Sequence, residues 1–471
     1  MPVASLEDMP ILRQLVTQAQ RSKVPLHVPG HKQGRLLPGV FSEWLGAASR
    51  IDLTELAGLD NLHLPTGCIL QSQRYAALHY GAHASLFSVN GSTAAIIAAL
   101  MSTAHQGRVL FLNSPHTSAW RGLVLADGEA VFAPVSFDGR RFSEQAPSLE
   151  LAESILRTGG FTCMYVTSPT YTGAVAPIRQ LAEVAHRHGI PLIVDEAHGA
   201  HFGLVPEMPE HSVEAGADVV VHSVHKMLPG LTQTAWLHVQ GELVDVDTIA
   251  QSLSMLQTTS PSYLLLASLD AAQAWLRKEG KAVVARSMSH LAPLQEASFV
   301  AGSGVYDPFR HWVPTGSLRQ SKALERYLAE QGIFVEYADA LGVLSIFGLD
   351  ASRREVNLYS DTLNKWLALQ GTHPDAEDVP VGQLFSLLAE ERRPLMRPRE
   401  THFQARTWVP AKQAAGRICG LPITPYPPGV PLLWPGQVIT GTVLRVLREL
   451  VEGGYEVHGL GNDGEIPVYA M

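Results

Sequence analysis

The sequence has 471 residues, of which 46% are hydrophobic and 17% are charged. This composition is typical of a folded protein with a large core, and the length suggests two or three domains. The formal net charge is −9, from 35 basic and 44 acidic residues without a basic block, which argues against nucleic acid as a partner.

Nothing in the sequence indicates secretion or membrane insertion. The N-terminus, MPVASLEDMP, lacks the basic and apolar regions of a signal peptide, and the apolar run AAIIAALM is too short to span a bilayer. The three cysteines form no CxxC pair, which suits a reducing compartment better than a disulfide framework. We therefore expect a cytoplasmic protein without a membrane partner, and we predict no metal site.

The first 48 residues predict an N-terminal arm. A short helical pattern over residues 7–22 is followed by a Pro- and Gly-rich stretch, VPLHVPGHKQGRLLPG, over residues 24–39. We interpret residues 1–48 as an arm and not as a domain.

Short apolar strands alternate with helical patterns or polar joints between about residues 80 and 240. The strands are ASLFSV, RVLFL, EAVFAPV, CMYVTS, IPLIVDEA, ADVVVHS and TAWLHV. One of the helices, PIRQLAEVAHRHG, has Pro at its start and Gly at its end. Strands without two-residue alternation are typical of a sheet buried on both faces. The sequence therefore predicts an α/β fold, with a mostly parallel sheet sandwiched by helices.

The rest of the chain predicts a smaller unit. A helix-rich segment over residues 248–300 leads to GIFVEYADALGVLSIFGL and then to the Pro-rich but apolar LPITPYPPGVPLLWPGQVI, which should pack against other residues. We predict a large domain over residues 49–295 and a smaller α+β C-terminal part over residues 296–471.

Two polar groups follow the first strands of the large domain, and ligands of open α/β sheets bind outside the carboxyl ends of the strands. In FSVNGSTAAIIAAL, Ser92 and Thr93 open a helix, where free N–H groups and the helix dipole favour an anion; the alternative is an ordinary helix cap. His116, in FLNSPHTSAW, either stacks on a flat cofactor or is a polar loop residue.

A carboxylate ends the strand IPLIVDEA. Asp195 needs a positive partner there, either a protonated ring nitrogen or an Arg or Lys side chain. Alternation along the strand places Glu196 on the opposite face. His198, one turn further on, is close enough to act as a proton carrier.

Lys226 follows the next strand, in VVVHSVHKMLPG. An aspartate and then a lysine on successive strand ends is the pairing that pyridoxal 5'-phosphate requires: the lysine forms a Schiff base, and the aspartate keeps the pyridine nitrogen protonated. Together with the helix start at Ser92 and with His116, this order predicts that cofactor. His222 has no explanation in the sequence, because alternation puts it on the other face from Ser223.

Eight motifs spread over nearly the whole chain resemble those of the Orn/Lys/Arg decarboxylase family, bacterial enzymes of pyridoxal fold type I. They are PLHVPGHKQG, DLTELAGLDNLHLPTG, VNGSTAA, SPTYTG, VDEAHGAHFG, HSVHKMLPGLTQ, LQTTSPSYLLLASLD and TPYPPGVPLLWPG. The chain is similar to the shorter members, without the N-terminal wing domain. The resemblance implies decarboxylation of arginine, lysine or ornithine to the corresponding amine in polyamine metabolism, with arginine favoured by chain length.

The resemblance also implies roles for single residues. Lys226 would be the Schiff-base lysine, Asp195 the partner of the ring nitrogen and His116 the stacking residue. His198 would lie near the Schiff base, and either it or Lys226 would return a proton to the substrate. The residues that would surround the phosphate are Ser92, Thr93, Ser223 and His225.

Enzymes of this family are dimers with the active site at the subunit interface. The resemblance therefore implies a homodimer or a dimer-based oligomer. In it, HVPGHK (27–32), which contains His31, and QTTSPS (257–262) would reach the neighbour's cofactor.

The substrate end of the site is less defined. Glu336 and Asp339, in FVEYADALG, are candidates for binding the distal cation of a basic substrate, or are simply solvated. The motif GRICGLPITPYPPG has Gly420 and Leu421 where the family has Ala-Glu, and Gln437 replaces a glutamate. A smaller or more apolar substrate stays open for that reason, as do an aminotransferase or aldolase-type lyase and a non-catalytic paralogue acting as a regulatory subunit.

Overall fold

The computed structural model describes residues 3–138, 143–297, 304–315, 317–339, 341–370, 394–426, 431–452 and 454–470. Its helices are α1 Pro10–Arg21, α2 Gly39–Leu45, α3 Cys68–Tyr80, α4 Gly91–Thr103, α5 Thr117–Ala126, α6 Leu149–Leu156, α7 Ile178–Arg187, α8 Val224–Met227, α9 Val246–Met255, α10 Tyr263–Trp275, α11 Lys281–Ala297, α12 Leu318–Glu330, α13 Arg353–Gln370, α15 Pro398–Phe403 and α16 Gly441–Glu452. Within these described segments, no helix has both the length and the apolar character needed to cross a membrane.

The strands of the large sheet are β1 Ala84–Ser88, β2 Arg108–Phe111, β3 Glu129–Phe132, β6 Phe161–Thr167, β7 Leu192–Asp195, β8 Val219–Ser223 and β9 Ala235–Val239. The smaller strands are β4 Phe137–Asp138, β5 Ser143–Glu144, β10 Arg310–Pro314, β11 Tyr337–Ala338, β12 Gly342–Ile346, β13 Arg406–Val409, β14 Thr424–Tyr426, β15 Glu456–His458 and β16 Ile466–Tyr469.

The large sheet has the order β1-β9-β8-β7-β6-β2-β3 and is mostly parallel, as the sequence predicts. Strand β9 is the exception, because it runs against both of its neighbours, β8 and β1. The sheet order brings the carboxyl ends of β6, β7 and β8 side by side in the middle of the sheet, and Asp195, His198 and Lys226 lie at or just after the ends of β7 and β8.

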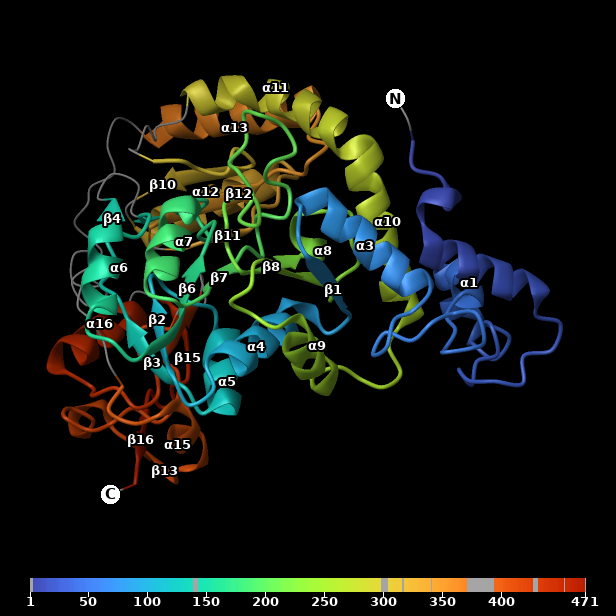
Figure 1. Cartoon of the computed structure of the whole chain (residues 1–471). Coiled ribbons are helices and arrows are strands. Elements are labelled where there is room, and N and C mark those ends of the chain that lie inside the picture. Colours follow the sequence, from blue (N-terminus) through green and yellow to red (C-terminus); the bar gives the residue numbers. More distant parts are fainter. Residues whose placement is uncertain are drawn as a thin grey trace.

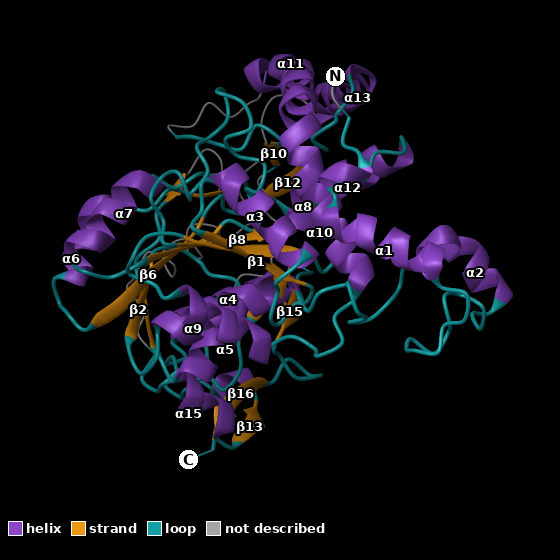
Figure 2. Ribbon diagram, turned by 45° about the vertical axis from the view of Figure 1, so that its right-hand side comes forward, coloured by secondary structure: helices purple, strands orange, loops and turns teal. Residues whose placement is uncertain are grey.

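Both faces of the large sheet are covered, which explains the continuous apolar strands. Alternate strand residues belong to two separate cores: Val194 and Val220 pack with α3, α7 and α10, whereas Ile193 and Val221 pack with α4, α5 and α9. Figures 1 and 2 show these helices as two layers with the sheet between them. The α/β sandwich predicted from the sequence is therefore confirmed.

The later part of the chain forms smaller sheets. Strands β10, β12 and β11 make an antiparallel sheet next to α12 and α13. Two two-stranded sheets, β13-β16 and β14-β15, share an apolar core with α16. The Pro-rich stretch packs as expected: Leu432 and Leu433 are buried in that core, and Trp434 stacks on Trp120 of α5 at 5.2 Å between ring centroids.

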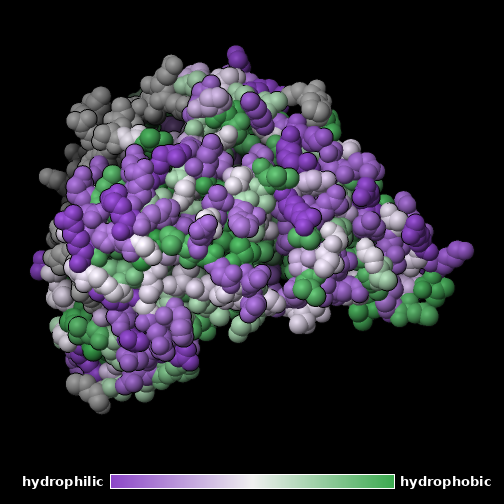
Figure 3. Space-filling view, viewed as in Figure 1, coloured by the Kyte–Doolittle hydropathy of each residue, from purple (hydrophilic) through white to green (hydrophobic). Residues whose placement is uncertain are grey.

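The N-terminal arm projects from the body (Figure 1, blue). Helix α1 is held by a carboxylate from α10, because Asp270 Oδ2 accepts the N–H groups of Ile11 at 2.8 Å and Leu12 at 3.0 Å. Beyond α1 the arm carries apolar side chains on its surface, of which Leu26 and Trp44 are each 88% exposed. Figure 3 shows hydrophobic atoms gathered at the end of the arm.

Candidate functional site

Asp195 ends β7 as a buried carboxylate with neutral partners. It is 3% exposed, accepts a hydrogen bond of 3.0 Å from the Tyr165 hydroxyl at Oδ2, and accepts one of 3.2 Å from the Ala197 N–H at Oδ1. Tyr165 comes from the neighbouring strand β6 and lies on the same face of the sheet. Because neither partner is cationic, the site retains an acidic group that suits a positively charged ligand atom.

Lys226 lies in the one-turn helix α8, directly after β8. Its Nζ is 3.0 Å from Nε2 of His198, which follows β7. Lys226 keeps solvent-accessible surface, but protein surrounds the amine closely enough that desolvation lowers its pKa; the negative charge of Asp195 opposes this shift. Strands β7 and β8 thus bring together the three residues that the sequence proposes for the chemistry.

A group of hydroxyls stands at the N-terminus of α4. Ser92 and Thr93 lie in the first turn of this helix, and the Ser223 hydroxyl, at the end of β8, donates to Ser92 Oγ at 2.8 Å. His225 lies in α8, and its Nδ1 donates to the Thr234 carbonyl at 3.0 Å. The hydroxyls and the positive end of the helix dipole form a setting that favours an anion.

His116 is the N-cap residue of α5, and its Nδ1 accepts a hydrogen bond from the Ser118 N–H. Burial lowers the pKa of His116, while the charge of Asp195 raises it and that of Lys226 lowers it. The ring is therefore neutral and within electrostatic reach of both residues. Because His116 also keeps accessible surface, it has room for a flat ligand ring beside it.

Glu336 interacts with residues of the same site, whereas Asp339 binds backbone N–H groups of the turn in which it lies. Glu336 Oε1 accepts a hydrogen bond of 2.7 Å from the Tyr171 hydroxyl, and the charge of Glu336 acts to raise the pKa of Lys226. Asp339 is buried and accepts the N–H groups of Leu341 and Gly342 in the turn before β12, at 2.8 and 3.0 Å. Burial raises the pKa of Asp339 to about 7.

His31 lies in the arm. Its Nε2 is 3.1 Å from Asp52 Oδ2, and its Nδ1 accepts a hydrogen bond from the Gly34 N–H at 2.9 Å.

The altered C-terminal motif has hydrogen-bond partners close to it. Gln437 Oε1 accepts the Trp434 N–H at 2.9 Å, and the Gly420 N–H donates to the Pro467 carbonyl at 2.9 Å. The neutral side chain of Gln437 therefore suffices to accept the hydrogen bond from the Trp434 N–H.

Three further residues contact the site and were not identified from the sequence. Tyr165 binds Asp195, and the edge of the Tyr171 ring meets His198 with 5.0 Å between ring centroids. Arg310, in β10, donates from Nη2 to His198 Nδ1. Alternation could have indicated Tyr165, which precedes the strand end by two residues. No local pattern marks Arg310, because its contact depends on how the second sheet packs.

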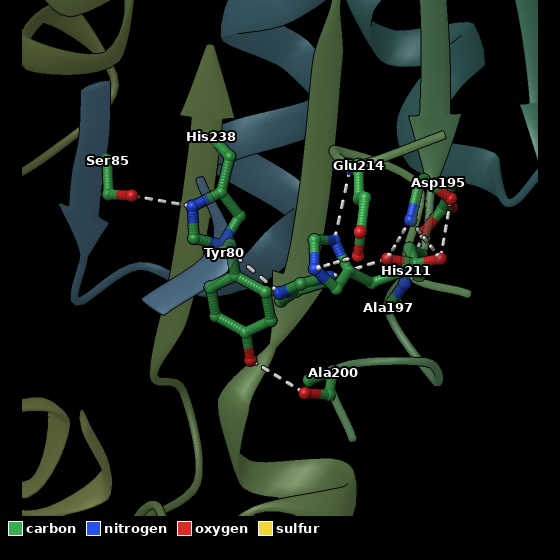
Figure 4. A network of polar contacts seen from close by, with 11 residues as sticks. Tyr80, Ser85, Asp195, Ala197, Ala200, His211, Glu214 and His238 are labelled. Carbon is green, nitrogen blue, oxygen red and sulfur yellow. Dashed lines mark hydrogen bonds and ion pairs between the residues drawn. The ribbon is translucent and has the colours of Figure 1, made fainter. Parts of the chain in front are cut away.

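His222 belongs to a buried polar chain on the other face of the sheet, and Figure 4 labels the His238 and Ser85 end of this chain. Its Nε2 is 2.8 Å from Glu196 Oε2, and its Nδ1 is 3.1 Å from Nε2 of His238, whose Nδ1 is 2.6 Å from the Ser85 hydroxyl. Burial raises the pKa of Glu196 to about 7 and lowers the pKa values of His222 and His238. This chain joins β7, β8, β9 and β1 and accounts for His222.

Comparisons with known proteins agree over most of the chain. Residues 9–311 match the family model "Orn/Lys/Arg decarboxylase, major domain", and residues 386–465 match "Orn/Lys/Arg decarboxylase, C-terminal domain". The arginine decarboxylase of Bacillus subtilis (strain 168) is 32% identical over 97% of this chain and 96% of its own length, and that of Bacillus anthracis is 31% identical over 96% and 95%.

A solved structure of the constitutive lysine decarboxylase of E. coli has a similar fold. It superposes with a TM-score of 0.81 at 21% identity and covers 98% of this chain and 81% of that one.

Proposed function

The chain belongs to the Orn/Lys/Arg decarboxylase family, and from this premise we propose that arginine is its main substrate among the basic amino acids, with agmatine as the product and polyamine metabolism as its setting. The observation that carries the proposal is the acidic Glu336 near Lys226, on the Tyr171 hydroxyl. The names of the two Bacillus relatives favour arginine over lysine and ornithine.

The described residues fit pyridoxal phosphate, the cofactor of this family. Hydroxyls at the N-terminus of a 13-residue helix suit its phosphate, and Asp195 with two neutral donors suits its ring nitrogen. Lys226, which keeps accessible surface, suits its aldehyde. We propose that Lys226 bonds the aldehyde, that His116 lies against the ring and that the phosphate binds to Ser92, Thr93, Ser223 and His225.

Bound by these residues, the cofactor would supply a sink for the electron pair that the α-carbon keeps when its bond to the carboxylate breaks and carbon dioxide leaves. Asp195, held by the Tyr165 hydroxyl and the Ala197 N–H, would stabilise positive charge on the ring nitrogen. The neutral His116 adds no charge to the ring face. A site with little water favours loss of the charged carboxylate as an uncharged gas. The proton that replaces carbon dioxide on the α-carbon comes, in our proposal, from Lys226 or His198.

Glu336 is our proposal for the residue that binds the distal cation of the substrate. A guanidinium forms two parallel hydrogen bonds with a carboxylate, which an ammonium does not. The Tyr171 hydroxyl holds one oxygen of Glu336 and so orients the carboxylate. Asp339 is less suitable, because the turn before β12 uses its oxygen.

We propose that the chain forms a homodimer through the N-terminal arm, with QTTSPS near the interface, in the cytoplasm. The exposed Leu26 and Trp44 support this, because apolar side chains of this size are rarely left in water over a contiguous segment. In this arrangement His31 would approach the partner's site.

The test is release of carbon dioxide from a panel of arginine, lysine, ornithine and apolar amino acids by the purified protein. We expect a yellow protein, fixation of the cofactor on Lys226 by borohydride, and the highest kcat/KM with arginine. Lys226→Ala should be colourless and inactive. Accumulation of a keto acid without carbon dioxide, or a preference for an apolar amino acid, would contradict the proposal.

A further inference from the structure

A chain of three nitrogen-bearing side chains crosses from the small sheet to the candidate lysine. Arg310 of β10 donates from Nη2 to Nδ1 of His198, and Nε2 of the same histidine is 3.0 Å from Nζ of Lys226. His198 is therefore contacted at both ring nitrogens by cationic residue types.

The chemistry of these groups fixes where the protons are. A guanidinium carries only donors and does not lose its proton, so Nδ1 of His198 has to be the acceptor. A histidine that accepts at Nδ1 is neutral and carries its one proton on Nε2. That proton is donated to Lys226, and a lysine nitrogen accepts a hydrogen bond only as the uncharged amine. The geometry is thus consistent with only one distribution of protons.

Arg310 is anchored so that it stays in this position. It is 6% exposed, its Nε donates to Asp307 Oδ2 at 3.1 Å, and its Nη1 donates to the Tyr171 carbonyl. Asp307 in turn is fixed by the buried His201, 3.0 Å away. A planar guanidinium held at three of its nitrogens has little freedom to turn away from His198.

We propose that Arg310 is a positioning residue: by donating to Nδ1 of His198 it keeps the proton of that ring on Nε2 and so holds Lys226 as an uncharged amine. The uncharged form is the nucleophile that condenses with an aldehyde, so Arg310 prepares Lys226 for the cofactor. The inference rests on the proposed role of Lys226 in the function above.

The arrangement also separates the roles of His198 and Lys226. With Nδ1 occupied by Arg310, His198 has no free lone pair to take up a proton, and it serves as a fixed donor at Nε2. His198 therefore cannot supply the proton that the α-carbon receives, and Lys226 can supply it only after taking up the proton that the substrate's α-ammonium loses on binding. The shifts of the pKa agree with this, because burial and the charge of Arg310 both lower the pKa values of His198 and Lys226.

The test measures the pH midpoint of the Lys226 amine in the full-length chain freed of cofactor. Trace acetylation with acetic anhydride, quantified by mass spectrometry, reports the uncharged fraction, and the exposed Lys412 serves as the internal reference. Other charged or titratable groups that face Lys226 are Asp195 from β7, Glu336 from the segment before β11 and His116 from the start of α5. We expect the wild-type midpoint of Lys226 to lie below that of Lys412.

Arg310→Met should raise the midpoint of Lys226 by about one pH unit or more. In a His198→Gln background, the same substitution should cause less than half of this shift, because Arg310 acts through the histidine. Equal shifts in both backgrounds would show that only the charge of Arg310 matters and would overturn the proposal. A wild-type midpoint equal to that of Lys412 would overturn it without any variant.

Arg310→Met leaves Asp307 without its guanidinium partner, so the single variant is paired with Arg310→Met/Asp307→Asn, which removes both charges. The double variant should show the same raised midpoint, and an unshifted midpoint there would also contradict the proposal. The assay is independent of turnover. If the midpoint of Lys226 is low but no carbon dioxide is released, only the proposed function is contradicted. If carbon dioxide is released but the midpoint of Lys226 equals that of Lys412, only the role of Arg310 is contradicted.

Discussion

The hydroxyl of Tyr171 donates a hydrogen bond of 2.7 Å to Glu336, and the ring that carries this hydroxyl stands edge-on to His198. Tyr171 follows β6 of the large sheet, and Glu336 precedes β11 of the small sheet. The contact therefore ties an acidic group of one sheet to the strand ends of the other, where Lys226 lies.

Glu336→Gln should raise the KM for arginine about tenfold with a smaller change in kcat, because the ion pair between the exposed carboxylate of Glu336 and the guanidinium is lost. Steady-state kinetics with carbon dioxide detection measures both constants. Tyr171→Phe is the matched control: it keeps the carboxylate and removes only its orienting hydrogen bond, so its effect on KM should be smaller. An unchanged KM in Glu336→Gln would exclude Glu336 as the binding group.

Asp195→Asn should reduce kcat by about a hundredfold or more, because a neutral amide does not stabilise a protonated ring nitrogen. Tyr165→Phe removes one hydrogen bond to the same carboxylate and should cost only severalfold in kcat. The absorbance of the bound cofactor shows whether it is retained in each variant. Equal losses in the two variants would mean that Asp195 acts by its hydrogen bonding and not by its charge.

Glu196 should make stability fall as the pH rises. Burial raises its pKa from 4.5 to about 7 in the folded chain. The folded state therefore keeps a proton that the unfolded chain has already lost, and the stabilisation present below about pH 4.5 is lost as the pH approaches and passes 7. The size is at most about 3.5 kcal/mol, from roughly 1.4 kcal/mol for each pH unit of the pKa shift.

Glu196→Gln mimics the protonated acid, since its amide can donate to Nε2 of His222 while its oxygen accepts from Ser212. Denaturant unfolding of both proteins at pH 5 and pH 8 measures the difference. We expect the free energy of unfolding of the wild type, relative to the variant, to be lower at pH 8. A difference that does not change with pH would contradict the raised pKa.

Asp270→Ala should lower the free energy of unfolding by about 2–4 kcal/mol, because the N–H groups of Ile11 and Leu12 and the hydroxyl of Ser72 lose a buried acceptor. Asp270→Asn keeps an acceptor oxygen and should cost less. Thermal unfolding followed by circular dichroism compares the two. Limited proteolysis should cut the arm faster in Asp270→Ala, and equal cutting rates would show that α1 is held by its apolar contacts alone.

Leu26→Glu/Trp44→Glu should convert the proposed dimer to monomers, because the substitutions place charges on the apolar surface of the arm. Sedimentation or light scattering measures the mass. Leu358→Glu, at a 49% exposed position on α13, is the control and should leave the mass unchanged. A double variant that keeps the wild-type mass would place the interface elsewhere.

The central sheet was predictable because each of its strands is marked by the residues of that strand alone. Val219–Val221 and Leu192–Val194 are apolar without alternation, and such strands are buried on both faces of a parallel sheet. The reversed direction of β9 also had a signal: only a short loop separates it from α8, and a parallel crossover needs a dozen residues or more. The division of the chain at residues 48 and 295 stays a prediction.

The site was predictable only where its residues follow strands. Asp195 and Lys226 meet because β7 and β8 are adjacent, whereas Arg310 reaches His198 only through packing of the small sheet. Asp339 and Glu336 are both acidic residues of the same short segment, so the sequence does not distinguish them. The structure does, because Asp339 accepts the N–H groups of the turn before β12. His222 could not be explained from the sequence, because only the order of the strands brings its partners, His238 in β9 and Glu196 after β7, next to it.

Helix α1 leaves the ribosome well before α10, whose Asp270 carboxylate caps it from 259 residues further along the chain. At about 5–20 residues synthesised per second, the nascent chain waits roughly 10–50 seconds for that acceptor. Until α10 has emerged and folded, Ile11 and Leu15 have no complete surface to bury against. Subunit pairing through the arm, as proposed above, would therefore be delayed until most of the large sheet has been translated, which would keep unfinished chains from associating through it.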